Sequence, residues 1–157
     1  IYLNSAELIQ SHLGKIGVTF TINMVDHPTM HKMIRKDVNP LVPYGSERFP
    51  VADVLLTQFY HSDHIVGKPT GITNFSHYGE VIPGIDELIE AARIEDDIEI
   101  QKELWAQAQE KIMNDVPAYP LRVTYVLFAR KKNIELGYDL ESNITLHYQI
   151  TENTNIK

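Results

Sequence analysis

The sequence contains no cysteine, no long apolar run and few basic side chains. Without cysteine the chain has no disulfide, no thiolate nucleophile and no cysteine-based zinc site. No apolar stretch approaches the roughly 20 residues that a membrane-spanning helix needs. The 14 basic and 21 acidic residues give a formal net charge of −7, which argues against binding to the phosphates of nucleic acid.

Motifs of common enzyme classes are also missing. The chain has no Gly-x-Ser-x-Gly turn of a serine hydrolase and no glycine-rich phosphate or dinucleotide loop. No other group of catalytic side chains stands out. We therefore do not expect an enzyme, and we expect no cofactor.

The composition is that of a folded chain. Of the 157 residues, 43% are apolar and 22% are charged, so the sequence is neither disordered nor fibrous. The length is close to that of one domain. A chain of this size buries roughly two-thirds of the surface that it exposes when unfolded.

The first third of the chain predicts a helix, a strand and a second helix. Apolar side chains recur at helical spacing over residues 4–16, and Gly17 is placed to stop that helix. Residues 18–24 alternate apolar and polar side chains, which is typical of a half-buried strand. Residues 28–37 predict a short helix that begins with a proline in its first turn.

The middle of the chain predicts a strand between two loops. Residues 38–50 are rich in proline and predict a loop. Residues 52–59 are mostly apolar without alternation, which predicts a strand covered on both faces. Residues 60–83 hold three glycines, two prolines and three histidines, so they predict a long loop of the kind that carries function.

The remainder predicts two helices and a strand. An amphipathic helix begins at Ile85, and a second helix follows over residues 97–114 with acidic side chains at its start. Residues 121–129 alternate and predict a long strand, and residues 144–146 predict a short one. This order of elements favours an α/β fold, a mixed open sheet with flanking helices.

Aromatic and acidic side chains gather where the strand over 52–59 is expected to end. Phe59, Tyr60 and Asp63 lie there, and Tyr78 follows in the same loop. In open α/β sheets ligands bind beyond the carboxyl ends of strands. Aromatic rings offer flat apolar walls, and a carboxylate can hold an ammonium group. Two interpretations stay open: these residues bind a ligand, or the aromatic rings only cap the core.

Three histidines in the same loop offer a metal site as an alternative. His61, His64 and His77 are residues of the type that binds zinc or nickel. Their spacing matches no helical metal motif. A polar loop that happens to hold histidines explains the pattern equally simply.

Three stretches, in order, resemble motifs of the family 5 extracellular solute-binding proteins, the peptide, dipeptide and nickel receptors of ABC importers. Residues 6–18 read AELIQSHLGKIGV, residues 74–89 read NFSHYGEVIPGIDELI and residues 104–121 read LWAQAQEKIMNDVPAYPL. No single motif is specific for this family, but the order of the three motifs and the distances between them together are specific.

The resemblance implies a receptor that closes two lobes around a solute and delivers it to a membrane permease. It implies that this chain is a fragment whose first lobe and signal peptide lie upstream of Ile1. Residues 1–132 would form most of the C-terminal lobe of a class II periplasmic-binding-protein-like fold, and residues 133–157 would be a tail that returns toward the first lobe. It also implies an extracytoplasmic location, either periplasmic or lipid-anchored at the cell surface.

Site residues are implied as well. In peptide-binding members of the family the segment matching 52–60 ends in a tryptophan, and an aspartate three residues later pairs with the α-amino group of the peptide. Tyr60 stands at the tryptophan and Asp63 at the aspartate. The loop after Asp63 departs from the family pattern, because it lacks the usual aromatic residue and early proline.

Other outcomes also follow from these patterns. A nickel or metal-chelate receptor using His61, His64 and His77 is the alternative within the family. A free-standing α/β interaction module is the alternative outside it. If the first lobe is missing, exposed apolar surface favours dimers of the fragment.

Overall fold

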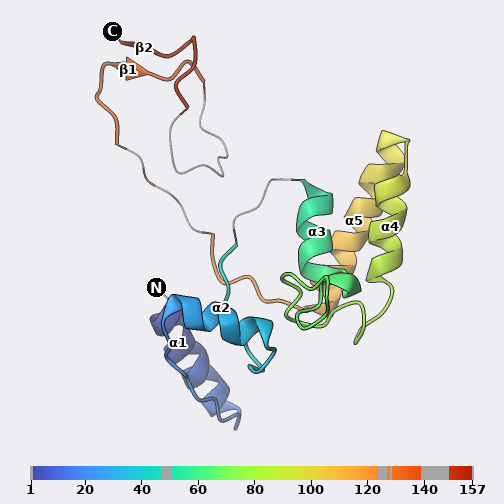
Figure 1. Cartoon of the computed structure of the whole chain (residues 1–157). Helices are drawn as coiled ribbons and strands as arrows, with labels where there is room; N and C mark the ends of the chain where they lie inside the picture. Colours follow the sequence, from blue (N-terminus) through green and yellow to red (C-terminus); the bar gives the residue numbers. More distant parts are fainter. Residues whose placement is uncertain (1, 47–50, 124–126, 128, 139–148, 157) are drawn as a thin grey trace.

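The computed structural model describes residues 2–46, 51–123, 127, 129–138 and 149–156. It is rich in helix and holds a small sheet (Figure 1). The helices are α1 (Tyr2–Lys15), α2 (His27–Arg35), α3 (Ala52–Tyr60), the short 3-10 helix η1 (Ser62–His64), α4 (Ile85–Ile94) and α5 (Ile98–Asp115). The strands are β1 (Ile134–Glu135) and β2 (Asn155–Ile156), which pair antiparallel with Ile134 opposite Ile156.

The core lies where α3, α4 and α5 pack side by side (Figure 1). Ile85 and Ile89 on one face of α4 are fully buried, and they meet Ala108 and Ile112 from α5. Leu56 of α3 completes this cluster. Burying such aliphatic side chains contributes about 1.5–3 kcal/mol each, so this three-helix body holds the loop between α3 and α4 in place.

Local signals explain where these helices begin and end. The Asp97 carboxylate accepts hydrogen bonds from the backbone N–H groups of Glu99 and Ile100, which caps the start of α5. At its end Val116 adopts a left-handed conformation with φ of 50°. Asp26 caps α2 in the same way as Asp97, by accepting from the Thr29 N–H. The predicted helices over 4–16, 28–37 and 97–114, and the one beginning at Ile85, are therefore confirmed.

The strand predicted over residues 52–59 is wrong, because these residues form α3. A short apolar run fits a buried strand and a buried helix equally well. The Asp53 carboxylate accepts a hydrogen bond from the Thr57 hydroxyl one turn later, at 2.8 Å, and Leu56 packs against α4. The helix thus buries its apolar face against a neighbouring helix rather than in a sheet.

The strand predicted over residues 18–24 is also absent. Phe20 and Ile22 are half-buried between exposed neighbours, so the alternation in burial is real. Among the described residues, however, no strand lies beside this segment to complete a ladder of hydrogen bonds. One carbonyl, that of Phe20, accepts instead from the side chain of Gln10 on α1.

The predicted mixed open sheet is not found in the described part of the chain, where the one sheet consists of β1 and β2. Of the predicted strand over 121–129, residues 121–123 are irregular and exposed, and residues 124–126 and 128 lie outside the described residues. The predicted strand over 144–146 also lies outside them. The loops predicted over 38–50 and 60–83 are confirmed where they are described, apart from the single turn η1.

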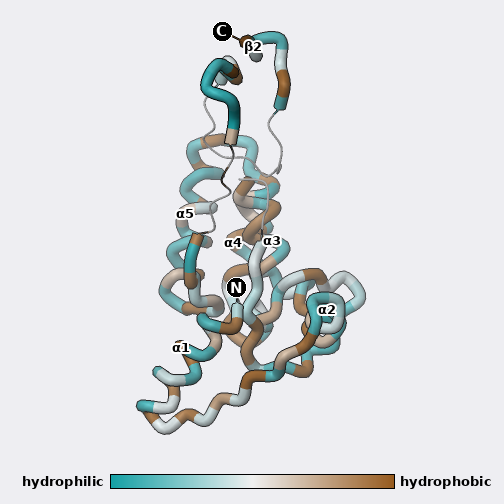
Figure 2. Tube along the Cα trace, turned by 90° about the vertical axis from the view of Figure 1, so that its left-hand side faces the viewer, coloured by the Kyte–Doolittle hydropathy of each residue, from teal (hydrophilic) through white to brown (hydrophobic). Residues whose placement is uncertain are grey.

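Apolar residues alternate with polar ones along the extended segments outside the three-helix body (Figure 2). Val18 and Met24 expose 46% and 71% of their surface. Contiguous exposed apolar surface is typical of sites where other protein packs. Across the described ranges, no helix has both the length and the apolar character needed to cross a membrane.

Candidate functional site

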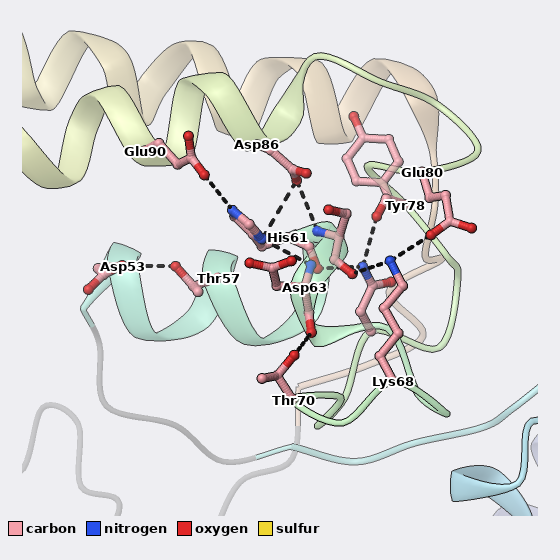
Figure 3. Close-up of polar contacts among 12 residues, drawn as sticks. Asp53, Thr57, His61, Asp63, Lys68, Thr70, Tyr78, Glu80, Asp86 and Glu90 are labelled. Carbon is pink, nitrogen blue, oxygen red and sulfur yellow. Dashed lines mark hydrogen bonds and ion pairs between the residues drawn. The ribbon is translucent and has the colours of Figure 1, made fainter.

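The candidate site is the turn that follows α3 and faces the first turn of α4 (Figure 3). Helix α3 ends at Tyr60, and His61 leaves it in an extended conformation with φ of −72° and ψ of 139°. η1 then begins at once. The chain reverses direction within a few residues, and hydrogen bonds to buried side chains fix this reversal.

His61 is buried and anchors the turn. Its Nδ1 atom accepts a hydrogen bond from the backbone N–H of Asp63 at 3.1 Å. Its Nε2 atom lies 3.3 Å from Oε1 of Glu90 on α4. Because Nδ1 accepts, the proton of the neutral ring is on Nε2, which donates to Glu90. Both ring nitrogens are occupied by these structural contacts.

Asp86, in the first turn of α4, holds the turn from the other side. Its Oδ1 atom accepts a hydrogen bond from the backbone N–H of Ser62 at 2.9 Å. Gly79 passes close beside it with φ of +90°, and a Cβ atom at Gly79 would lie 2.7 Å from the same oxygen. Only glycine fits this position without displacing Asp86.

Asn74 ties the two sides of the loop together. It is fully buried, and its Nδ2 atom donates to the backbone carbonyls of His61 at 3.0 Å and Tyr78 at 2.8 Å. Its Oδ1 atom accepts from the Ser76 hydroxyl at 3.2 Å. Every polar atom of this amide is therefore satisfied, as burial requires.

Asp63 differs from its surroundings because its carboxylate is exposed. Its backbone carbonyl accepts from the Thr70 hydroxyl at 2.6 Å, and its backbone N–H donates to His61. Within the described residues the carboxylate itself has no partner. The turn therefore fixes the backbone of Asp63 and presents a free negative charge to solvent.

Aromatic rings gather at the end of α3, just before the turn, and Tyr60 packs partly against the three-helix core. Phe59 and Tyr60 are both half-buried, with ring centroids 6.4 Å apart. Tyr44 lies 6.3 Å from Phe59 and 4.9 Å from Phe75, again between centroids. Sequence reasoning missed Tyr44 because it stands in a proline-rich loop far from the other rings in the chain.

Tyr78 lies in the core rather than on the surface, with 1% of it exposed. Its hydroxyl donates to Oδ2 of Asp115 at 2.6 Å, and Nζ of Lys111 lies 2.9 Å from the same oxygen. Burial and the Asp115 carboxylate raise the pKa of the Tyr78 phenol well above its ordinary value. In this structure the Tyr78 ring packs within the buried core, where a solute does not reach it.

One cation stands near the turn. Nζ of Lys68 donates to the Ser62 carbonyl at 3.2 Å and lies 2.6 Å from Oε2 of Glu80. The hydrogen bond from Lys68 and its charge lower the pKa of Glu80. The ion-pair partner of Lys68 is thus Glu80.

The three histidines of the metal alternative do not converge. The rings of His61 and His64 are 6.3 Å apart between centroids, whereas Nε2 of His77 is 2.8 Å from Oδ2 of Asp37. In the part of the chain that the structure describes, no three histidine, aspartate or glutamate side chains could hold one metal ion together.

One solved structure is similar to nearly the whole chain. It is the PBP/SBP (periplasmic or solute-binding protein) MoaA from A. tumefaciens R10, in complex with mannopinic acid. The match has a TM-score of 0.72 and 41% sequence identity and covers 98% of the present chain. The chain spans 30% of the length of that protein. No protein-family model matches the chain, and no curated protein matches it either.

This similarity gives the chain a context. The three-helix body and the loop between α3 and α4 resemble part of a solute-binding protein, which is not an enzyme. The match accounts for less than a third of MoaA.

Proposed function

We propose that the chain is the C-terminal lobe of a two-lobe solute-binding protein that serves an ABC importer. The observation that carries this proposal is the 41% identity to MoaA over 98% of the chain. The three motifs that resemble family 5 solute-binding proteins agree with it. The complete protein works outside the cytoplasm, closes on its solute and hands it to a membrane permease.

The solute contact that we propose is the exposed carboxylate of Asp63, with Phe59 and Tyr60 at the end of α3 as an apolar wall. Asp63 has a fixed backbone and a free charge, which suits it to an ammonium group. Tyr78 contributes indirectly, because its carbonyl and that of His61 are the acceptors that Asn74 holds. The first solute class that we propose is accordingly short peptides with a free α-amino group.

One such contact does not give tight binding. A hydrogen bond to a charged group contributes about 1.5–3 kcal/mol. A micromolar dissociation constant requires about 8 kcal/mol. The remainder must come from apolar burial when a second lobe closes over the site, so the isolated chain binds peptides weakly.

The test uses the protein produced from its natural reading frame, including any sequence before Ile1. Titration calorimetry with a short peptide gives the affinity of the unchanged protein, and an N-acetylated form of the same peptide removes the ammonium group. We expect Asp63→Asn to weaken the free-amine peptide and to leave the acetylated peptide unchanged. Asp96→Asn, at an exposed acid between α4 and α5, is the matched control. If Asp63→Asn binds each peptide with the same affinity as Asp96→Asn does, the role of Asp63 is refuted.

A second solute class is favoured by the neighbour itself, because MoaA is in complex with mannopinic acid. Competition between a peptide and mannopinic acid in the same titration separates the two classes. Binding of mannopinic acid alone would support the solute-binding role and overturn the peptide assignment.

We also propose that the 157-residue chain associates with itself when no first lobe covers it. The motivating observation is the row of exposed apolar side chains between α1 and α2, including Val18 and Met24. Such surface favours contact between copies. The test is light scattering over a hundredfold range of protein concentration, from about 10 µM to 1 mM. Only monomer across this range would contradict the expectation.

A further inference from the structure

Helix α2 carries two histidines one turn apart. His27 is its first residue and His31 follows four positions later, so both side chains lie on the same helix face. Their Nε2 atoms are 3.1 Å apart. The ring centroids are 4.5 Å apart with an angle of 81° between the planes. The two nitrogens are therefore close enough to contact one ion beside the helix.

We propose that His27 and His31 bind a divalent late first-row transition metal ion, such as Cu²⁺, Ni²⁺ or Zn²⁺, between their Nε2 atoms. Imidazole nitrogens lie about 2.0–2.1 Å from such ions, so two of them at angles of about 90–110° are about 2.9–3.4 Å apart. The observed separation of 3.1 Å falls inside this range. The ion enters without any rearrangement of the helix.

The surroundings of the pair hold it in place. The ring of Tyr44 packs edge-on against His31, with centroids 6.0 Å apart and an angle of 90°. Asp26, the residue before His27, accepts two hydrogen bonds from Thr29 and fixes the first turn of the helix. Its carboxylate is charged and lies close enough to His27 to interact with it electrostatically. A negative charge beside a cation site favours the bound ion.

Proton balance follows from the hydrogen bond between the rings. Without metal, one Nε2 atom donates its proton to the other. Binding needs both Nε2 lone pairs, so the donor ring carries its proton on Nδ1 instead. The ion then replaces the shared proton, and both rings stay neutral.

The site is open. Because the described residues contain no group of three potential ligands, the pair supplies two donors, and water or donor atoms of a solute fill the other positions. Affinity for such a nitrogen site increases from Ni²⁺ to Cu²⁺ and decreases again at Zn²⁺. Cu²⁺ is therefore the most sensitive probe. This site is separate from His61, His64 and His77, which do not converge.

The test is titration of the full 157-residue chain with Cu²⁺ in a buffer without chelators, followed by calorimetry and by electron paramagnetic resonance. Two variants remove the pair. His27→Ala deletes one ligand, and His31→Ala combined with Lys32→His keeps the number of histidines but moves one to the wrong face of the helix. His12→Ala, on α1, is the matched control. Far-UV circular dichroism confirms that each variant keeps its helices.

We expect one Cu²⁺ ion per chain with a spectrum of two coordinated nitrogens. Both pair variants should weaken binding by more than the roughly tenfold cost of losing a mere outer-shell partner. His12→Ala should leave the affinity unchanged. If the variant with the displaced histidine binds Cu²⁺ as tightly as the unchanged chain, the spacing does not matter and the proposal is wrong.

Discussion

Replacing Asn74 by aspartate would show how strongly the loop between α3 and α4 depends on one amide. The substitution keeps the shape of the side chain but removes both hydrogen bonds that Nδ2 donates to the carbonyls of His61 and Tyr78. A buried partner left unsatisfied costs about 1–3 kcal/mol, so the two together cost about 2–6 kcal/mol. That loss is a large part of the free energy of unfolding of a typical folded domain, which is about 5–15 kcal/mol.

The measurement is urea unfolding followed by the fluorescence of Trp105, the single tryptophan, which packs against the three-helix core. Asn23→Asp is the control, because Asn23 is exposed and the same change there should be close to neutral. A loss below about 1 kcal/mol for Asn74→Asp would refute the view that this amide organises the loop.

The pH dependence of the variant has a definite sign. A carboxyl group buried against two carbonyl oxygens has a raised pKa, because both burial and the facing oxygens disfavour its charged form. The variant is therefore most stable below the pKa that this carboxyl group has in the unfolded chain, about 3.9. Its stability decreases as pH rises through the raised pKa of the folded state. The deficit of Asn74→Asp relative to the unchanged protein should be smaller at acidic pH than at neutral pH.

Three further substitutions test other parts of the structure. Tyr78→Phe removes the hydroxyl that donates to Asp115 and should lower the free energy of unfolding by about 1.5–3 kcal/mol in a urea titration, and no loss would contradict the contact. That same bond lowers the pKa of Asp115, so its stabilising effect should be complete above about pH 4 and decrease as pH falls further, which unfolding curves across that range would detect. Asp97→Ala removes the cap of α5 and should cost about 1 kcal/mol, with circular dichroism during thermal unfolding as the measurement and an unchanged midpoint as the contrary result. Gly79→Ala forces a Cβ atom against Asp86 at positive φ and should lower the free energy of unfolding by about 1–3 kcal/mol. An unfolding curve of the variant that matches that of the unchanged protein would disprove this.

The helices other than α3 could be predicted from the sequence because their signals are local. Asp97 and the regular apolar spacing after it suffice to place α5 to within a residue, since the cap and the buried face are both set by near neighbours in the chain. Strands differ, because a strand forms only against a partner. Residues 18–24 have the pattern of a strand, and Phe20 and Ile22 are half-buried accordingly, yet no strand lies beside them in the described structure.

The candidate site was predictable only in part. The sequence placed Asp63 and the neighbouring aromatic residues close together in the chain, and in the structure Asp63 is exposed whereas Phe59 and Tyr60 are half-buried. It did not show that Tyr78 is buried beneath that loop or that Tyr44 joins the rings from a distant segment. Burial of one ring and approach of another depend on packing between elements, which no local pattern encodes.

The sequence by itself determined the helices other than α3, the absence of disulfides and the acidic balance, because these follow from composition and from contacts within a few residues. Only the tertiary structure decided that residues 52–60 form α3, since the helix is stabilised by packing Leu56 against α4 and not by its own apolar run. The tertiary structure likewise decided which polar groups are occupied. His61 is buried between Asp63 and Glu90, whereas the Asp63 carboxylate remains free, because chain segments 24 or more residues apart meet at that turn.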